Sequence, residues 1–114
     1  MDKHISIARD FSRTPAGRFK ADGPKSGEAF REDLLYPALK EADSVEVDLD
    51  GALGYGSSFL EEAFGGLVRE KNMSAEELAA KLKIKSTHEN YEGRIWRYIR
   101  DAEAHYPRAL KKPR

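Results

Sequence analysis

The segment that decides the fold is VDLDGALGYGSSFLEEAFGGL, residues 47–67. Val45, Val47 and Leu49 alternate with acidic residues, which predicts a strand with one face in the core. A glycine-rich loop follows, and then a helical apolar pattern that predicts a helix from about Phe59 to Lys71. The apolar positions of that helix are Leu60, Ala63, Phe64 and Leu67. Two glycines inside the helix weaken it, and close packing of a neighbouring segment would offset that cost.

Outside this segment, strand and helix patterns alternate along the chain. Strands are predicted at His4–Phe11 and around Leu82 and Ile84, with a weak strand in RFKA, residues 18–21. Ser26 is predicted to cap a helix over residues 27–42, with a kink or break at Pro37. A short helix lies within residues 73–82, and a final helix covers residues 88–105. The pattern predicts an α/β fold, with a small mixed sheet of about four strands and helices packed on it.

Length and composition bound the class of protein. The chain has 114 residues, which fits one domain at residues 1–105 followed by a basic C-terminal tail at residues 106–114. It has no cysteine, which excludes disulfides, thiol catalysis and thiolate metal sites. No apolar run approaches the roughly 20 residues that span a bilayer, and the first residues lack the apolar core of a signal peptide. We therefore expect a cytoplasmic protein.

The charges are balanced overall but unevenly distributed. The net charge is zero, which argues against a dedicated nucleic-acid-binding protein. Residues 1–25 nevertheless hold six basic and three acidic residues. One open alternative is therefore a small nucleotide- or nucleic-acid-binding protein that uses this basic region, within which Arg18 is the candidate anion-binding residue. The cations concerned are Arg9, Arg13, Arg18, Lys20 and Lys25.

The glycine-serine turn at Gly54–Phe59 matches no common catalytic motif. It lacks the third glycine of a dinucleotide fingerprint, the GK[ST] of a P-loop and the final glycine of a nucleophile elbow. The three histidines, at 4, 88 and 105, do not occur at metal-ligand spacing. The sequence therefore predicts no catalytic residue, no metal and no cofactor.

Ser58 and Glu61 have the spacing of a capping box, in which the serine caps the helix and the glutamate bonds back to it. The same spacing recurs at Ser74 and Glu77 and at Ser86 and Glu89. A cap at Ser58 is compatible with a second role, because a helix N-terminus also favours an added phosphate.

Three segments together carry a resemblance to a known family: ARDFSRTPAGR, DGPKSGEAFR and VDLDGALGYGSSFLEEAFGGLVR. They resemble the STAS-like domains of unknown function, which are related to the STAS domains of bacterial anti-sigma-factor antagonists. The resemblance covers residues 5 to about 100. In the antagonists a D-S-S-G turn opens a helix and its second serine is phosphorylated by the partner kinase. Here Gly56 replaces the aspartate and Phe59 replaces the glycine.

The resemblance implies a STAS-like fold and a non-enzymatic module for protein–protein interaction in bacterial or phage signalling. Its implied partner is a histidine-kinase-like ATPase. The implied partner-binding or regulatory residues are those of the turn: Gly54, Tyr55, Gly56, Ser57, Ser58 and Phe59.

Overall fold

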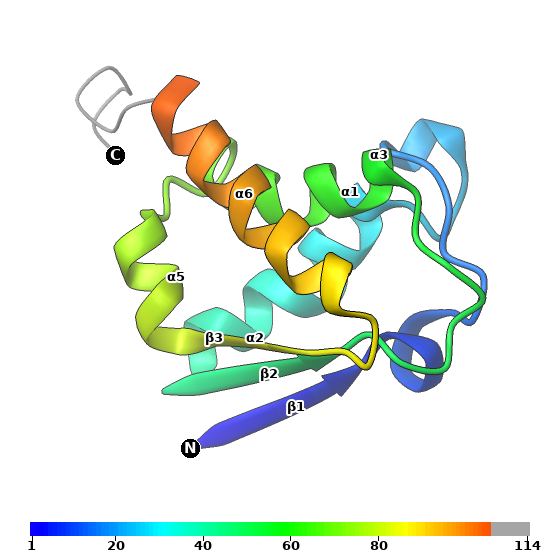
Figure 1. Cartoon of the computed structure of the whole chain (residues 1–114), viewed down its shortest axis with the longest axis horizontal. Helices are drawn as coiled ribbons and strands as arrows, with labels where there is room; N and C mark the ends of the chain where they lie inside the picture. Colours follow the sequence, from blue (N-terminus) through cyan, green and yellow to red (C-terminus); the bar gives the residue numbers. More distant parts are fainter. Residues whose placement is uncertain (106–114) are drawn as a thin grey trace.

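The structure is a computed structural model that describes residues 1–105, apart from the side chain of Glu89. Strands lie along one side of the molecule and the helices cover the other (Figure 1). The predicted basic tail, residues 106–114, lies outside the described residues.

The sheet has three strands in the part of the chain that is described, and all are parallel. They are β1 (Asp2–Ser6), β2 (Ser44–Asp48) and β3 (Leu82–Lys85), in the order β1-β2-β3. Val47 at the centre pairs with Ile5 on one side and Ile84 on the other. The predicted α/β class is confirmed, the prediction of a mixed sheet is wrong, and a fourth strand is not confirmed within residues 1–105.

RFKA is the predicted strand that does not form. It runs into a single 3-10 turn, η2 (Lys20–Asp22). The Phe19 N–H donates to the Asp22 carboxylate at 2.9 Å, and the Lys20 N–H donates to Glu28 at 2.8 Å. Because nearby carboxylates take these backbone donors, the segment does not pair with a strand.

The first strand ends at Ser6 rather than continuing to Phe11. A π-helical turn, η1 (Ile7–Phe11), follows it directly. The Ser6 hydroxyl accepts the Arg9 N–H at 3.2 Å, and the Asp10 carboxylate accepts the Ser6 N–H at 2.8 Å. These two local bonds begin a helical turn where the apolar alternation predicted more strand.

The first long helix comprises α1 (Gly27–Phe30), the π-helical η3 (Arg31–Leu35) and α2 (Tyr36–Glu41). The predicted cap is confirmed, because the Ser26 hydroxyl accepts the Ala29 N–H at 3.1 Å. The helix does not break at Pro37. Instead the winding changes just before it, where the Tyr36 N–H donates to the Arg31 carbonyl, five residues back. Proline's missing donor is thus accommodated beside a wider turn.

The second long helix comprises α3 (Ser57–Leu60), the π-helical η4 (Glu61–Gly65) and α4 (Gly66–Arg69). Its predicted apolar face is confirmed, since Leu60, Ala63, Phe64 and Leu67 are fully buried. This helix packs against α1 and against α6 (Glu89–His105), whose Ile95 and Ile99 are also buried. It is therefore enclosed along most of its length, and its first residues are where it reaches the surface.

The short helix α5 (Ala75–Lys81) confirms one predicted capping box. The Ser74 hydroxyl accepts the Glu77 N–H at 3.0 Å, and Glu77 accepts the Ser74 N–H at 2.9 Å. The similar box predicted at Ser86 involves the side chain of Glu89, which lies outside the described atoms. Across residues 1–105, no helix has the length and apolar character needed to cross a membrane.

Candidate functional site

The loop after β2 lies at the carboxyl edge of the parallel sheet, where ligand sites of open α/β folds commonly occur. Gly51 turns the chain there with a φ of 97°, a conformation that favours glycine. A Cβ on Gly51 would also lie 3.1 Å from the Cβ of Ala8. The backbone conformation and the close approach of Ala8 therefore both favour glycine at position 51.

Tyr55 fastens this loop to the fold. Its hydroxyl donates to the Leu49 carbonyl at 2.7 Å, and its ring meets that of Tyr91 edge-on at 5.3 Å. Burial, together with the nearby charges of Asp48 and Asp50, raises the pKa of Tyr55 far above its usual range. The side chain of this predicted contact residue is buried and holds the loop in place.

Phe59 is also buried. Its ring lies 6.1 Å from that of Phe30 and 6.3 Å from that of Phe11, in an aromatic cluster under the helix start. Of the six predicted contact residues, three are exposed: Gly56, Ser57 and Ser58. The structure thus leaves a short exposed segment between two buried aromatic side chains.

The capping box predicted at Ser58 does not form. The helix begins two residues earlier than predicted, at Ser57, with Gly56 in the capping position and no side chain bonded there. Glu61, the other half of the predicted box, instead binds Arg69 and Arg18. Within the described residues the hydroxyls of Ser57 and Ser58 have no hydrogen-bond partner, so the fold does not use them.

Leu53 is a surface residue of this loop that sequence reasoning missed. It is 80% exposed, and its backbone N–H donates to the Arg13 carbonyl at 2.9 Å. Continuing the alternation of β2 would place Leu53 in the core, but the turn at Gly51 ends that alternation. Gly51 was therefore the signal in the sequence that could have identified Leu53 as an exposed apolar residue.

A small depression lies beside the loop, with a volume of about 120 Å³. Thr87 donates its N–H and its hydroxyl to Asp50, at 2.9 and 3.0 Å, and these bonds hold the pKa of Asp50 below its usual range. Pockets for ligands of drug size occupy roughly 300–1,000 Å³. This depression is therefore too small for a nucleotide-sized cofactor. Among the described side chains, no group of three His, Cys, Asp or Glu could hold a metal ion.

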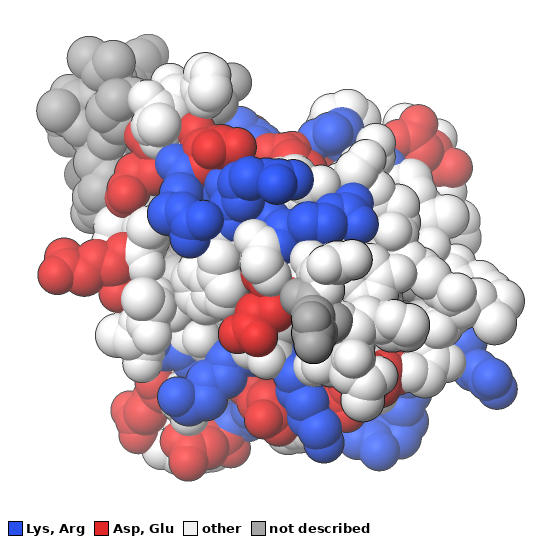
Figure 2. Space-filling model, viewed as in Figure 1, with Lys and Arg blue, Asp and Glu red and all other residues white. Residues whose placement is uncertain are grey.

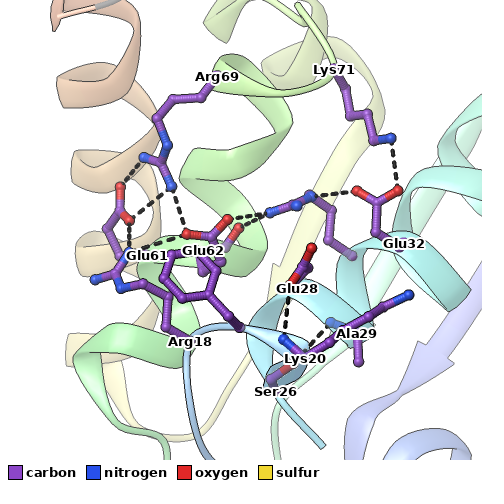
Figure 3. Close-up of polar contacts among 12 residues, drawn as sticks. Arg18, Lys20, Ser26, Glu28, Ala29, Glu32, Glu61, Glu62, Arg69 and Lys71 are labelled. Atoms are coloured by element: carbon purple, nitrogen blue, oxygen red, sulfur yellow. Dashed lines mark hydrogen bonds and ion pairs between the residues drawn. The ribbon is translucent and has the colours of Figure 1, made fainter. Parts of the chain in front are cut away.

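Arg18 lies against the helix that follows the turn. Its Nη1 is 2.6 Å from Glu61 Oε1 and 3.2 Å from Glu62 Oε1 (Figure 3). Two carboxylates thus already occupy one side of the guanidinium. Binding of an external anion by Arg18 stays a prediction.

Behind Arg18, a network of charged side chains joins the two long helices (Figure 3). Arg31 Nη1 lies 2.8 Å from Glu62 Oε2, and both side chains are almost completely buried. Lys71 and Arg31 bind Glu32, at 2.7 and 2.9 Å, which extends the network toward α4. Glu62 does not belong to the predicted apolar face of its helix, yet it is buried because it pairs with Arg31.

This network explains one of the two helix glycines. A Cβ on Gly66 would overlap Arg31 Nη1 and lie 2.9 Å from its Cζ. The predicted close approach is confirmed, although a side chain rather than a backbone makes it. Backbone approach occurs instead at Gly27, where a Cβ would overlap the Phe59 carbonyl oxygen.

Residues 26–92 match the family described as "STAS-like domain of unknown function (DUF4325)". The matched segment begins at the Ser26 cap and ends within α6, so it includes β2, the glycine loop and the charged network. No curated protein and no solved structure matches the chain significantly. Because the match covers more than half of the 114 residues, the predicted resemblance is confirmed, and the chain belongs to the family of STAS-like domains of unknown function.

Proposed function

We propose that the chain is a non-enzymatic module that binds a partner protein through the segment Leu53–Ser58. The observation that carries this proposal is the 80% exposure of Leu53 on the same short segment as two serine hydroxyls that have no hydrogen-bond partner among residues 1–105. Burying an exposed apolar side chain against a partner is favourable, because binding removes its surface from water.

The segment is held in one conformation before any partner binds. Tyr55 and Phe59 fix it from below, and Gly54 and Gly56 leave space for close approach, since no atom lies within 4 Å of a Cβ built on either glycine. Preorganised segments lose less conformational entropy on binding. These features support docking of a partner that supplies a pocket for Leu53.

The proposed partner is a histidine-kinase-like ATPase, and the proposed switch is phosphorylation of Ser57 or Ser58. A phosphate would add about two negative charges at the start of a helix, where negative charge is favoured. Glu61 and Glu62 follow closely, but their charges are already compensated by Arg18, Arg31 and Arg69. A phosphate would therefore change the docking segment while the fold remains intact.

The test uses paired variants as bait in extracts of the protein's own cells. Leu53→Ser removes the apolar anchor, and Phe19→Ser is its control because Phe19 is an exposed apolar residue outside the segment. Ser58→Asp adds a charge at the turn, and Ala79→Asp adds the same charge on the exposed side of α5. We expect a partner that is retained by both controls and lost with both Leu53→Ser and Ser58→Asp.

Calorimetry with the purified partner then measures each affinity directly. Loss of an interface anchor is expected to weaken binding by about tenfold or more. Equal affinity for wild type, Leu53→Ser and Ser58→Asp would show that the partner binds elsewhere and would overturn the proposed site.

A further inference from the structure

The outward face of α6 carries three arginines at three-residue spacing, Arg94, Arg97 and Arg100. Basic side chains form a band across this helix in Figure 2. Arg18, Arg31 and Arg69 pair with glutamates, whereas none of the α6 arginines pairs with a carboxylate among the described residues. Among the described side chains, no carboxylate therefore lies within ion-pair distance of these three guanidinium groups.

Neighbouring aromatic rings hold two of these guanidinium groups without neutralising them. Arg94 donates to the Tyr98 hydroxyl at 3.3 Å and lies 5.9 Å from the centre of the Tyr91 ring. Arg97 lies 5.8 Å from the centre of the Tyr98 ring. Contacts of this kind orient a guanidinium group while it keeps its full charge.

Gly93 lies inside α6 at the centre of this surface. Close packing of a neighbouring atom does not explain why this position holds a glycine. An interior glycine costs a helix about 1 kcal/mol relative to alanine. A Cβ on Gly66 would overlap a neighbour, but one on Gly93 would meet no atom within 4 Å. The missing side chain helps to leave an open depression of about 550 Å³, which Asn90, Gly93 and the three arginines line. A ligand can therefore approach the helix backbone closely here.

We propose that this surface, Asn90–Arg100, binds the phosphate backbone of a single-stranded nucleic acid. Arginine is well suited to phosphate because its planar fork can donate two parallel hydrogen bonds. Half-buried Trp96 lies four residues before Arg100, so both side chains occupy neighbouring positions on the helix surface. An aromatic ring beside a row of cations is the arrangement on which single-stranded bases stack.

The α6 surface differs from the basic N-terminal region, which the sequence suggested as a nucleic-acid-binding site. There Arg18 is paired with Glu61, Lys20 lies 3.7 Å from Asp33, and Arg9 lies 3.7 Å from Asp10. The three arginines lie on a different element from the docking segment Leu53–Ser58, and the two surfaces adjoin where the Tyr91 ring meets that of Tyr55 at 5.3 Å. Because the chain has no net charge, binding is expected to be modest, with a dissociation constant of roughly 1–100 µM at physiological salt.

The test is fluorescence anisotropy with labelled oligouridine and oligothymidine of about 12 nucleotides, a length within the range of single-strand sites. We expect binding of at least one strand, with a slope of log K against log salt of about −2 if three phosphates are contacted. Trp96 is the single tryptophan of the chain, so its fluorescence should change on binding.

Two triple variants with equal loss of charge locate the site. The variant Arg94→Gln, Arg97→Gln, Arg100→Gln should weaken binding about tenfold or more. The control Arg9→Gln, Arg13→Gln, Lys20→Gln should bind like wild type, and melting curves confirm that both variants fold. Absence of binding by the wild type at low salt, or equal binding by the α6 variant, would overturn the proposal.

Two further ligands identify the kind of polyanion. A duplex of the same length and a poly-glutamate of matched charge should both bind more weakly than the single strand. Tighter binding of poly-glutamate would assign the surface to an acidic protein segment, and tighter binding of the duplex would contradict single-strand recognition. Either result overturns the proposal as stated.

Discussion

Arg31 and Glu62 form an ion pair between the two long helices, and both lie in the first residues of π-helical segments. Arg31 Nη1 is 2.8 Å from Glu62 Oε2 and 2.6 Å from the Glu62 carbonyl oxygen, and the two side chains are 3% and 5% exposed. The guanidinium thus satisfies a carboxylate and a backbone carbonyl together. This contact fixes α1 and η3 against the helix that presents the docking segment.

Loss of Arg31 should be strongly destabilising. Arg31→Met removes the charge but keeps an apolar chain, and it leaves the Glu62 carboxylate buried with fewer partners. Removing one partner of a buried pair costs about 3–5 kcal/mol. Arg97→Met is the control, because an exposed side chain of this kind usually changes stability by less than about 0.5 kcal/mol. Urea unfolding of both variants measures the difference, and similar midpoints would show that the pair is dispensable.

The two glycines at positions 66 and 93 should respond to alanine in opposite directions. Gly66→Ala places a methyl group on the Arg31 guanidinium and should destabilise the protein despite the better helix propensity of alanine. Gly93→Ala meets open space and should stabilise it by up to about 1 kcal/mol. Thermal melts of the two variants check this, and a shift of the same sign in both would contradict the geometry.

Removal of the serine hydroxyl should lower the stability of the protein at Ser74 but not at Ser58. Ser74→Ala removes a cap and should cost about 1 kcal/mol. Ser58→Ala removes a hydroxyl that forms no bond among the described residues, so its cost should stay within about 0.5 kcal/mol. If chemical denaturation showed Ser58→Ala to be the more damaging variant, the helix start would have been placed wrongly.

Tyr55 should remain protonated in the folded protein at alkaline pH. Burial, aided by the negative charges of Asp48 and Asp50, raises its pKa. Above about pH 10 the unfolded chain loses this proton while the folded chain keeps it, so stability should fall as the pH rises. Ultraviolet titrations of the folded wild type and of Tyr55→Phe should show the same tyrosine ionisation until the protein unfolds, because Tyr55 keeps its proton in the folded state.

Tyr55→Phe distinguishes the contribution of the Tyr55 hydroxyl to stability from that of its aromatic ring. It removes the bond to the Leu49 carbonyl and should cost about 0.5–1.5 kcal/mol, while the loss of stability above about pH 10 should become smaller. An unchanged alkaline profile in Tyr55→Phe would assign that loss to other groups.

Glu61 should contribute to acid unfolding. Burial by itself would raise its pKa, but the bonds from Arg69 and Arg18 outweigh burial and hold the pKa below the usual range. A lowered folded-state pKa means that this stability is present above the ordinary glutamate range and is lost as the pH falls through and below that range. Glu61→Gln should therefore flatten the acid limb of the stability profile. Glu76→Gln on the exposed side of α5 serves as the control, and identical profiles for both would contradict the assignment.

The sequence by itself determined the strands, helix starts and helix faces that depend on interactions between neighbouring residues. Alternation at Val45, Val47 and Leu49 gave the central strand and its buried side, and the Ser26 and Ser74 caps placed two helix starts. The apolar stripe from Leu60 to Leu67 identified the buried helix face. These features depend on neighbouring residues and on helix or strand periodicity, so a linear pattern contains them.

Only the tertiary structure decided which partners the charged side chains bind. Charged residues far away in the sequence compete with the nearby residues of a local motif for the same side chain. Glu61 matched a capping box with Ser58, but Arg18, 43 residues away, and Arg69 bind its carboxylate instead. Glu62 does not belong to the apolar stripe of its helix, yet its ion pair with Arg31 places it in the interior. RFKA had a strand-like composition, yet carboxylates of Asp22 and Glu28 took its backbone donors. A carboxylate binds the cation that folding brings within reach, and only the packed helices determine which cation that is.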